Sequence, residues 1–528
     1  MRDIWTIDSE TDPFKAGRVP SPFIWGAYNG QEYHQFNDTK KLGRFLRDVD
    51  GIVYAHNGGK FDYHFLIDQA EAYDEMLIIN GRISKWRLGS AEMRDSMNIL
   101  PVPLADYQKD KIDYRIMERG QRDLPHNRSK IEDYLRSDCV YLHDLVSGFI
   151  GKYGLSITQA AASMKLWQQT SGVTVRDSGH VFFDNFKPFY YGGRVQAFKR
   201  GVGRGSFYLI DRISAYPAEM LGEHPFGTEY ESNPQRQRIR AQDFYVVDAV
   251  ARGCFPWREE FKLEFPDDGN SRTYYVTGHE LQAAVELGLL RKGWRVAERI
   301  TFAETINFGE YILTQHRERQ EAKKRGDKAN ALFSKLLMNS LYGKFGADPR
   351  RYRNHIIVPA REAPVDDATY PLAGYIGPWA LVENGEAQVY SRFYNVATAA
   401  SITGAERAAM MRGLHKVYGK LYGDTDGIVA QDIGRMKLGH DLGDWEVDDR
   451  DYYRWAIAGR KMYAFFYRKG DPCGCCGVRA KHASKGVKLS PDEIVRVAMG
   501  ETVSYDPIVP TFSVLKPPSF TRRDISIT

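Results

Sequence analysis

The chain has 528 residues, of which 43% are hydrophobic and 13% aromatic; this composition excludes a globally disordered protein, and the length exceeds the ~100–200 residues of a usual domain. The 73 basic and 68 acidic residues leave a net charge of +5, a balance too mild to establish a polyanionic partner. No apolar run approaches the ~20 residues that span a bilayer, and neither a secretory signal nor a transit peptide is visible, so we expect a cytoplasmic protein with no membrane partner.

The first predicted unit is an α/β domain over residues 1–165. Strand-like runs alternate with turn residues between positions 4 and 66, and apolar residues follow helical spacing over 130–150. Asp8 and Glu10 lie two apart in a strand-like run, so both carboxylates project from one face. A divalent metal could bind there, although a D-x-E pair alone is more often two solvated surface acids.

Two later motifs add acids to this pair. YAHNGGKFDYHFL supplies Asn57 and Asp62, and DYLRSDCVYL places Tyr134 and Asp138 four residues apart, on one face of a helix. The order D-x-E, N-x4-D, Y-x3-D resembles the three exonuclease motifs of family B DNA polymerases. That resemblance implies two Mg²⁺ ions, for which Mn²⁺ can substitute, and these catalytic ligands: Asp8, Glu10, Asp62 and Asp138.

The same resemblance implies roles for neighbouring residues. Tyr134 would orient the attacking water, and Lys109 in KDKIDY would approach the scissile phosphate, unless it is only a surface lysine. The frayed 3′ strand would be held by Asn57, Thr11, His56, Phe61 and Phe65. Plain core packing is an equal alternative for the two phenylalanines.

A second predicted unit follows the polar stretch 176–185 and contains another acid cluster. FYLIDRISAYP ends an apolar strand at Asp211, and LYGDTDGIVA carries Asp424 and Asp426 at a tight turn. Two paired strands would bring these acids together and create a negative site that a bound metal neutralises. The two segments resemble polymerase motifs A and C, which implies that Asp211 and Asp426 are the main catalytic Mg²⁺ ligands and Asp424 assists.

GVGRG at 201–205 is predicted to be a turn.

Two antiparallel helices are predicted between those motifs. The first, over 307–325, stops at Gly326, and Asp327 caps the second, which runs through Met338. KLLMNSLYGKFG resembles motif B and presents one helical face to an incoming nucleotide. Lys335 would contact its phosphates, Tyr342 would stack beside the new base pair, and Tyr216 would exclude a 2′-hydroxyl. The implied nucleotide-binding residues are Lys335, Asn339, Tyr342, Tyr216 and Lys323, the last with a solvated helix face as its alternative.

The remaining predicted contacts are to DNA. GRKMY resembles the K-x-Y motif that contacts the primer terminus, and YYGGR lies between the two units. The implied DNA-binding residues outside the exonuclease motifs are Tyr190, Gly192, Gly193, Ser340, Gly343, Lys461 and Tyr463. Where the family usually has Ser directly after the second acid of motif C, this chain has Gly427.

Six motifs in the family's order cover most of residues 4–490. YYGGR, the long segment between motifs A and B and the segment after Phe345 are similar to the protein-primed branch, and SETDPF, PFIWGAYNG, YAHNGGKFD and LPVPLA are similar to polymerases of tectiviruses of Gram-negative bacteria. The resemblance implies an α/β and α+β multidomain fold: an RNase H-like 3′–5′ exonuclease domain and a right-hand polymerase. Its implied parts are the exonuclease domain 1–165, palm 185–222 and 387–468, fingers 306–346, thumb and tail 469–528, a terminal-protein-docking insertion 223–305 and a second insertion 347–386 for processivity and strand displacement.

The implied partners are template and primer DNA, deoxynucleoside triphosphates and a terminal protein primer, bound by a monomer. Arg236, Arg238 and Arg240 could pair with acids on that protein or form a solvated loop. Two rivals stay open: a family B polymerase that extends ordinary nucleic-acid primers, and a catalytically silent scaffold. The complete acid set argues against the second, since buried like charges are costly without a metal.

Five cysteines in the whole chain do not resemble a secreted disulfide framework. Cys473, Cys475, Cys476 and His482 could supply four zinc ligands. We expect no zinc, because adjacent Cys475 and Cys476 make a poor chelate without a second well-spaced pair.

Overall fold

The structure is a computed structural model that describes most of the chain. The described residues are 2–527, except 177, 236–237, 261, 349–352, 365–369, 385–393, 471, 473–476 and 515. The cysteines of the zinc question and Arg236 therefore lie outside the described residues. Within them, no helix combines the length and apolar character needed to cross a bilayer.

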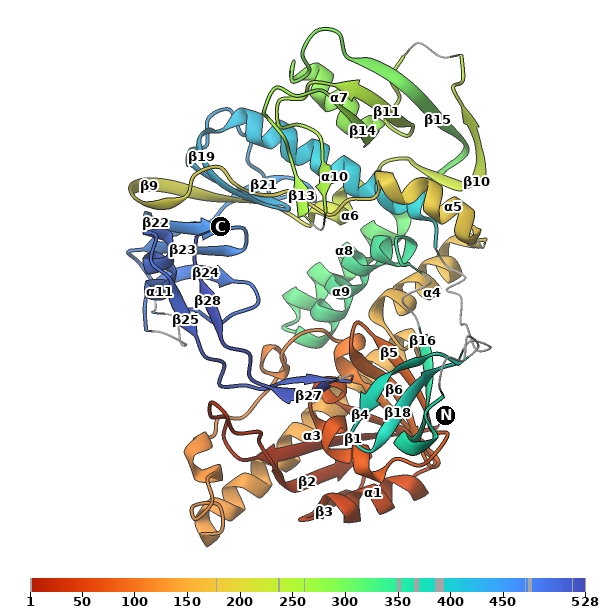
Figure 1. The fold of residues 1–528 in the computed structure, drawn as a ribbon, viewed down its shortest axis with the longest axis vertical. Coiled ribbons are helices and arrows are strands. Elements are labelled where there is room, and N and C mark those ends of the chain that lie inside the picture. Colours follow the sequence, from red (N-terminus) through yellow and green to blue (C-terminus); the bar gives the residue numbers. More distant parts are fainter. Residues whose placement is uncertain are drawn as a thin grey trace.

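A ten-stranded mixed sheet organises the N-terminal part of the chain (Figure 1). Its strands, in spatial order, are β17 (Leu372–Ile376), β18 (Trp379–Glu383), β16 (Arg353–Pro359), β5 (Glu75–Ile79), β6 (Arg82–Leu88), β7 (Ala91–Asp95), β4 (Gly51–Ala55), β1 (Asp3–Thr11), β2 (Pro22–Tyr28) and β3 (Tyr33–Phe36). Helices α1 (Thr39–Asp48) and α3 (Pro125–Tyr153) pack on it, and α3 extends the helix predicted over 130–150. The hydroxyl of Thr6 on β1 donates to the carbonyl of Cys139 on α3 at 2.8 Å, which fixes the helix across the central strands.

Three strands of this sheet come from much later in the chain. β16 pairs antiparallel with β5, and β18 and β17 continue the sheet beyond it. The implied insertion over 347–386 thus supplies three strands of the N-terminal sheet, an attachment that no sequence motif indicated. Buried apolar residues of these strands, including Ile357 and Leu381, complete the core that Trp86 and Ile83 begin.

A second, separate sheet has eight strands. It contains β24 (Ala480–Ser484), β23 (Met462–Tyr467), β22 (Tyr452–Gly459), β9 (Gly201–Arg212), β20 (Gly427–Asp432), β19 (Tyr418–Asp424) and β8 (Val195–Ala197) in that order, with β21 (Trp445–Val447) paired to β9. Helix α10 (Val396–Lys416) packs behind β20, α6 (Ala215–Glu219) follows β9, and α11 (Pro491–Ala498) covers β22 and β23.

The turn predicted over 201–205 is wrong, because these residues begin strand β9. Gly203 lies opposite Trp455 on β22, and a Cβ at Gly203 would lie 2.3 Å from the indole. Glycine at this position lets the indole ring lie over the neighbouring strand. Glycines in a strand can therefore be mistaken for a turn motif.

A four-stranded antiparallel sheet caps α10 at the top of Figure 1. It is built from β10 (His224–Ser232), β15 (Arg295–Ile306), β11 (Phe244–Ala249) and β14 (Arg272–Thr277), with helix α7 (Gly278–Glu286) and the hairpin of β12 (Trp257–Glu259) and β13 (Lys262–Glu264). Its core includes Tyr245, Val247, Tyr274 and Leu281, together with Met411 of α10.

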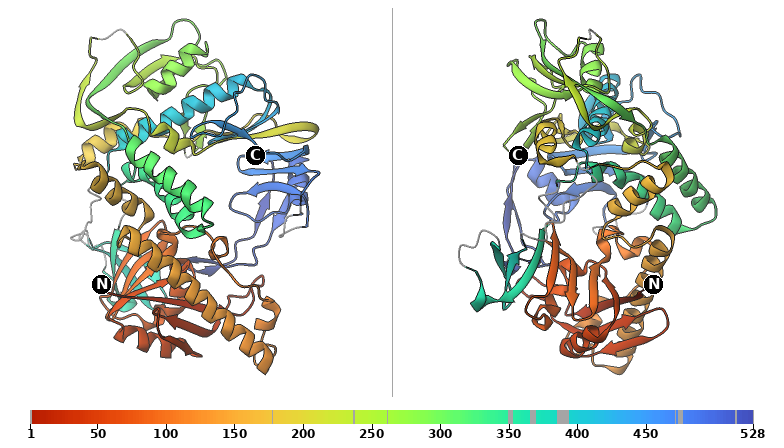
Figure 2. Two further views of the ribbon diagram at one scale, coloured as in Figure 1. Left: turned by 180° about the vertical axis from the view of Figure 1, so that it is seen from behind. Right: turned by 90° about the vertical axis from the view of Figure 1, so that its right-hand side faces the viewer.

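Two antiparallel helices, α8 (Gly309–Lys324) and α9 (Lys328–Phe345), lie between the N-terminal and four-stranded sheets (Figure 2). The predicted helix pair is confirmed: Gly326 has φ +72°, and the Asp327 carboxylate accepts from Asn330 N at 3.0 Å. α9 runs to Phe345, beyond the predicted end at Met338. Helix α4 (Gln159–Ser171) packs on this pair, whereas α5 (Gly179–Phe186) packs on α10 and the four-stranded sheet.

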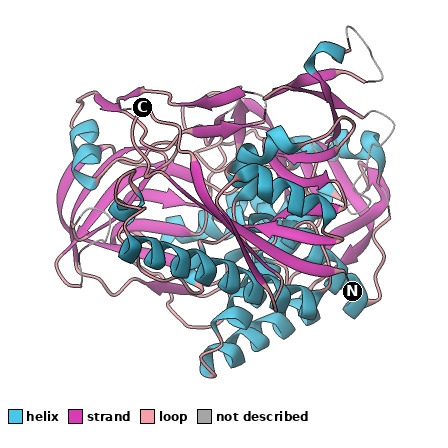
Figure 3. Ribbon diagram, turned by 90° about the horizontal axis from the view of Figure 1, so that it is seen from below, coloured by secondary structure: helices cyan, strands magenta, loops and turns pink. Residues whose placement is uncertain are grey.

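The C-terminal segment forms two short antiparallel pairs: β25 (Val503–Tyr505) with β28 (Arg523–Ile525), and β26 (Thr511–Ser513) with β27 (Lys516–Ser519). The second pair reaches the N-terminal sheet, where Val514 is buried in the same core as Trp86. Helices and strands are mixed along the whole chain (Figure 3), as an α/β and α+β protein requires.

Candidate active sites

The first acid cluster lies between strand β1 and helix α3. Ligand oxygens of Asp8, Glu10 and Asp138 all lie within 4.8 Å of one another. Among the described residues, no other set of three or more Asp, Glu, His or Cys side chains is grouped as closely. Strand alternation puts Asp8 and Glu10 on one face of β1, as predicted, and the packing of α3 across that face brings in Asp138.

Close packing of these carboxylates makes them hard to ionise together. Burial, then Asp138, raises the pKa of Asp8 well above its ordinary range, and the same two causes raise the pKa of Glu10 to about 8. Asp62, the first residue of α2 (Asp62–Leu66), lies outside the three-residue group but adds to both shifts. Burial raises the pKa of Asp62 to about 7, and the Ser9 hydroxyl donates to it at 2.6 Å. The site is thus suited to a cation.

Lys109 and Tyr134 lie at the edge of this cluster. The ammonium of Lys109 donates to Asp138 Oδ2 at 2.8 Å, whereas Asp138 Oδ1 is buried with no hydrogen-bond partner among the described residues. An orphaned buried carboxylate oxygen fits a hard divalent cation. The Tyr134 hydroxyl is 3.1 Å from that of Tyr114, the last residue of KDKIDY, for which no role was predicted from the sequence.

The predicted single-strand ligands fall into two groups by their contacts. Asn57 adopts φ 65° and its side-chain oxygen accepts from Arg82 at 2.9 Å, while Arg82 is also ion-paired with buried Asp95. His56 Nδ1 lies 2.9 Å from the Ser96 hydroxyl. Buried Thr11 donates its hydroxyl to its neighbour's carbonyl, Asp12 O, at 3.1 Å.

Phe61 and Phe65 belong to the second group, an aromatic cluster. Their ring centroids are 5.1 Å apart, and Phe512 of β26 packs edge-on against both, at 5.4 and 5.5 Å. Phe14 adds a half-exposed ring 5.8 Å from Phe61. Both half-buried phenylalanines therefore contribute to packing and still border solvent; the contact with Phe512 had no sequence signal.

The second acid cluster is carried by paired strands, as predicted. Asp211, the penultimate residue of β9, lies directly opposite Gly427 of β20, and Asp424 and Asp426 flank Thr425 in the β19–β20 turn. All three acids line one cavity of about 370 Å³, together with Lys461, Tyr463 and Lys481. A Cβ at Gly427 would lie 2.6 Å from Asp211 Oδ1, so glycine at this position lets the carboxylate lie against the turn.

Two lysines neutralise part of this cluster. Lys461 donates to Asp424 Oδ1, and Lys481 Nζ lies 3.6 Å from Asp211 Oδ2. Burial raises the pKa of Asp426, with Asp211 and Asp424 adding to it. The oxygen donors and their negative charge fit a divalent cation, although the three acids are less tightly grouped here than the exonuclease motif acids.

The helices α8 and α9 supply a cationic and aromatic face. Lys335 and Asn339 are exposed, and the Tyr342 ring stacks on Tyr216 at 4.4 Å and 22°. The pKa of Lys323 is lowered by nearby Arg319, by burial and by Lys335. Arg319, Lys323 and Lys335 thus lie near one another, and no sequence motif singled out Arg319.

Two further residues of α9 differ in their setting. Ser340 is buried and donates to the Leu337 carbonyl of its own helix at 3.3 Å, whereas Gly343 is exposed with open space around it. Of these two residues, only Gly343 is accessible to a DNA strand in this structure.

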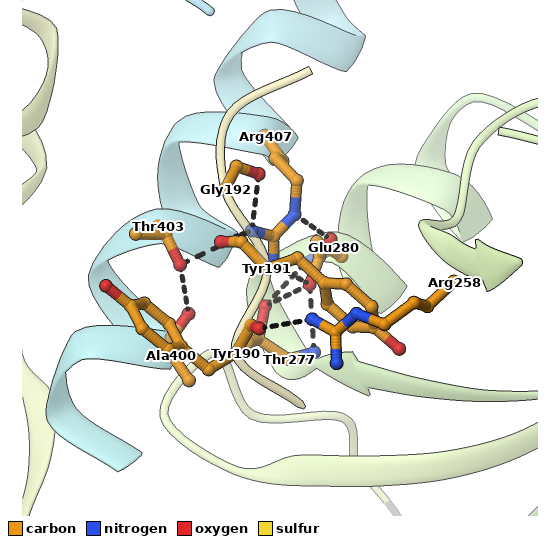
Figure 4. A network of polar contacts seen from close by, with 9 residues as sticks. All are labelled: Tyr190, Tyr191, Gly192, Arg258, Thr277, Glu280, Ala400, Thr403 and Arg407. Atoms are coloured by element: carbon orange, nitrogen blue, oxygen red, sulfur yellow. Dashed lines mark hydrogen bonds and ion pairs between the residues drawn. The ribbon is translucent and has the colours of Figure 1, made fainter. Parts of the chain in front are cut away.

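The segment YYGGR lies beside the β19–β20 turn, where the backbone N–H of Thr425 donates to Arg194 O at 2.6 Å. Figure 4 shows the two arginines that hold this segment. Arg407 of α10 donates to the carbonyls of Tyr191 and Gly192 at 2.7 and 3.2 Å, and forms a buried bidentate pair with Glu280. Arg258 donates to Tyr190 O at 3.0 Å. A Cβ at the next residue, Gly193, would lie 2.6 Å from Thr425 Cγ2.

Comparisons with known proteins agree with this arrangement. The sequence profile of the family described as DNA polymerase type B, organellar and viral, matches residues 102–368. The DNA-directed DNA polymerase of Enterobacteria phage PRD1 is 36% identical over 508 residues, covering 93% of this chain and 86% of the relative. The DNA polymerase of Streptococcus phage Cp-1 is 26% identical over 300 residues, covering 52% and 48%.

Among solved structures, phi29 DNA polymerase complexed with primer-template DNA and incoming nucleotide substrates superposes with a TM-score of 0.71 over 100% of both chains. At 17% identity this likeness shows the fold alone, and it confirms the predicted multidomain class. The profile match and the phage PRD1 relative carry the family assignment: the chain belongs to the family B DNA polymerases, of the organellar and viral type.

Proposed function

We propose that this polymerase copies a DNA template at its second acid cluster and removes mispaired 3′ nucleotides at its first. The observation that carries the proposal is that one chain holds two separate acid clusters. One lies on β1 and α3, and the other lies on the paired strands β9 and β20. The synthetic residues are Asp211, Asp424 and Asp426; the proofreading residues are Asp8, Glu10, Asp62 and Asp138.

Nucleotide addition is assigned to the face shared by α9, α6 and the acid cavity. Arg319, Lys323 and Lys335 bind the triphosphate and compensate the charge of the departing pyrophosphate. The base pairs with the template and stacks beside Tyr342, while Tyr216 lies under the sugar. Asn339 and the exposed backbone at Gly343 border the template base.

The primer terminus is assigned to the opposite side of the cavity. Lys461 and Tyr463 hold the last primer nucleotide, and the YYGG segment with Tyr190, Gly192 and Gly193 guides the template strand. The primer 3′-hydroxyl attacks the α-phosphorus and pyrophosphate leaves, so positioning supplies most of the rate.

Mg²⁺, or Mn²⁺ in its place, would be held by the carboxylates of each cluster. When bound, the ions supply activation of the attacking oxygen and charge stabilisation of the leaving oxygen.

Proofreading is assigned to the first cluster. Asn57, His56 and Thr11 hold the single 3′ strand, and the rings of Phe61 and Phe65 stack its bases. Tyr134 orients water for attack on the last phosphodiester, and Lys109 stabilises the charge that develops on it. The 3′ oxygen of the shortened strand leaves.

The parts of the chain are assigned to match: exonuclease 1–165, palm 185–222 and 387–468, fingers 306–346, thumb and tail 469–528, and a second insertion over 347–386 that surrounds template and supports strand displacement. We further assign residues 223–305 to docking of a terminal protein whose hydroxyl accepts the first nucleotide. This four-stranded sheet lies between motif A and the fingers, and its Arg238 and Arg240 are the described members of a basic group. The phage relatives support a place in the cytoplasm of a bacterial host. We also assign the enzyme to act as a monomer.

A pair of separation-of-function variants tests the proposal. Asp426→Asn is expected to lose extension of a labelled primer while degrading single strands at the parental rate. Asp138→Asn is expected to do the reverse. Extension by Asp426→Asn, or unchanged degradation by Asp138→Asn, would place the chemistry elsewhere.

Protein priming has its own test. The polymerase, Mg²⁺, one labelled deoxynucleotide and each small protein encoded beside this gene are incubated together, and covalent label on the partner is expected. No labelled protein, with efficient extension of ordinary primers, would instead favour the conventional-primer alternative.

A further inference from the structure

Arg212, the residue directly after Asp211, is held by two glutamates. Its guanidinium lies 2.5 Å from Glu219 Oε1 and is also ion-paired and hydrogen-bonded to Glu406 Oε2. Its Nε donates to Gly443 O at 2.9 Å. The side chains of Arg212, Glu219 and Glu406 are only 12%, 18% and 0% exposed. We call these three residues the Arg212 triad.

Burying the charged groups of the Arg212 triad costs free energy. The triad has two carboxylates for one guanidinium, and Glu406 Oε1 has no hydrogen-bond partner among the described residues. Burial raises the pKa of Glu406 to about 8. Apolar residues of similar volume usually serve stability as well as a buried ion pair or better, so its geometry calls for another explanation.

The triad joins three elements around the nucleotide site. Arg212 ends β9, and its backbone N–H donates to Asp426 O at 2.9 Å. Glu406 sits in the middle of the buried helix α10. Glu219 is the last residue of α6 and lies one helical turn after Tyr216. The side-chain contacts therefore tie α6 to both the acid cluster and α10.

Helix α6 needs such an anchor, because it has only five residues and begins after Ser214 in the left-handed region, with φ 48° and no side-chain cap. It also carries the ring that must be placed most accurately. Tyr216 stacks on Tyr342 at 4.4 Å, and a Cβ at Gly193 would lie 3.0 Å from the Tyr216 hydroxyl. A small displacement of α6 would change the space left beside the sugar.

We propose that Glu406 is a positioning residue for sugar selection, acting through Arg212 and Glu219 to hold α6 so that Tyr216 occupies the place of a 2′-hydroxyl. This inference rests on the proposed function, in which Tyr216 lies under the sugar. Loss of the anchor lets α6 shift and admits ribonucleotides, while the cations and acids that perform the reaction keep their places.

The test compares kcat/KM for dCTP and CTP on one primer-template, because the ratio of the two cancels differences in DNA affinity. Glu406→Ala is expected to lower discrimination by about tenfold or more, since small misplacements near reacting groups have effects of that order. Glu406→Gln keeps an acceptor for Arg212 and is expected to retain most discrimination. Glu219→Ala serves the same purpose as Glu406→Ala if the latter does not fold.

Two further variants separate the possible outcomes. Asp243→Ala breaks another buried ion pair, with Arg299 at 2.6 Å in the four-stranded sheet, and is expected to lower the melting temperature without changing the ratio. Tyr216→Val is expected to lower discrimination by itself, and adding Glu406→Ala should lower it little further.

If Tyr216→Val lowers discrimination and the Glu406 and Glu219 variants do not, the triad only stabilises the fold and the inference is overturned. If Tyr216→Val leaves the ratio unchanged, the proposed role of Tyr216 fails, and the inference fails with it.

Discussion

The ammonium of Lys109 lies 2.8 Å from Asp138 Oδ2, beside three carboxylates grouped within 4.8 Å. This lysine is partly buried and paired, so it is not simply a solvated surface residue. Its position places a fixed positive charge at the edge of the proposed proofreading site.

Lys109→Gln should therefore slow single-strand degradation by roughly 10²-fold, because the variant removes a charge that stabilises developing negative charge. Primer extension should be unchanged. Lys111→Gln, at an exposed position in the same segment, is the matched control. Parental degradation rates in Lys109→Gln would show that this lysine serves only to pair Asp138.

Metal affinity at the same cluster should depend on pH. Without metal, the folded chain holds protons that the unfolded chain releases, because the pKa of Glu10 is raised from 4.5 to about 8 and that of Asp62 from 3.8 to about 7. Stability of the metal-free protein should thus fall as pH rises from about 4 to about 8.

Binding of Mg²⁺ requires the ionised carboxylates, so its affinity should rise over the upper part of that range. The increase in melting temperature caused by Mg²⁺ should grow from about pH 6 to about pH 8.5. Glu10→Gln should remove this cluster's share of the increase. A metal effect that is independent of pH, or unaffected by Glu10→Gln, would contradict the assignment.

Arg319 is expected to bind the triphosphate of the incoming nucleotide. It is half-buried, burial lowers its pKa, and no acidic partner for it is found among the described residues. Arg319→Ala should raise KM for deoxynucleotides by about tenfold with a smaller change in kcat, as expected for loss of one charge-assisted contact. Arg317→Ala, two residues earlier and fully on the exposed face of α8, should change neither. Equal effects of the two variants would indicate a general charge effect.

Gly203 provides a stability prediction. Gly203→Ala would push a methyl group against the Trp455 indole, where a Cβ meets ring atoms at 2.3 Å, and should lower the free energy of unfolding by about 1–3 kcal/mol. Gly151→Ala, in a helix with open space around it, should raise it by about 0.5–1 kcal/mol. Chemical denaturation of both variants, monitored by tryptophan fluorescence, measures the difference. Equal free energies of unfolding for Gly203→Ala and Gly151→Ala would mean that strand β9 can move away from the Trp455 ring.

Local signals predicted much of this architecture. Strand alternation placed Asp8 and Glu10 on one face, a glycine and an aspartate marked the boundary between α8 and α9, and the tight turn at Asp424 and Asp426 required paired strands. These features depend on a few adjacent residues, so they are visible in sequence.

Contacts between distant segments could not be predicted in this way. Phe512 packs on Phe61 although most of the chain separates them in sequence, and β16 joins β5 although helices α3 to α9 lie between them in sequence. Arg319 and Glu406 lie on charged or small-residue helix surfaces, where spacing does not show what they contact. GVGRG misled because its glycines make room for Trp455, a partner that only the folded sheet reveals.

Continuous turnover of one nucleotide tests the central claim of two separate sites in one chain most directly. On a primer-template with only the next correct dNTP present, the parent enzyme should repeatedly add and excise that nucleotide, converting dNTP to dNMP. With the dNTP carrying the label, Asp211→Asn and Asp8→Asn should each abolish formation of labelled dNMP, the first by preventing addition and the second by preventing removal, and mixing the two variants should restore it. Sustained conversion of labelled dNTP to labelled dNMP by either variant alone would contradict the account.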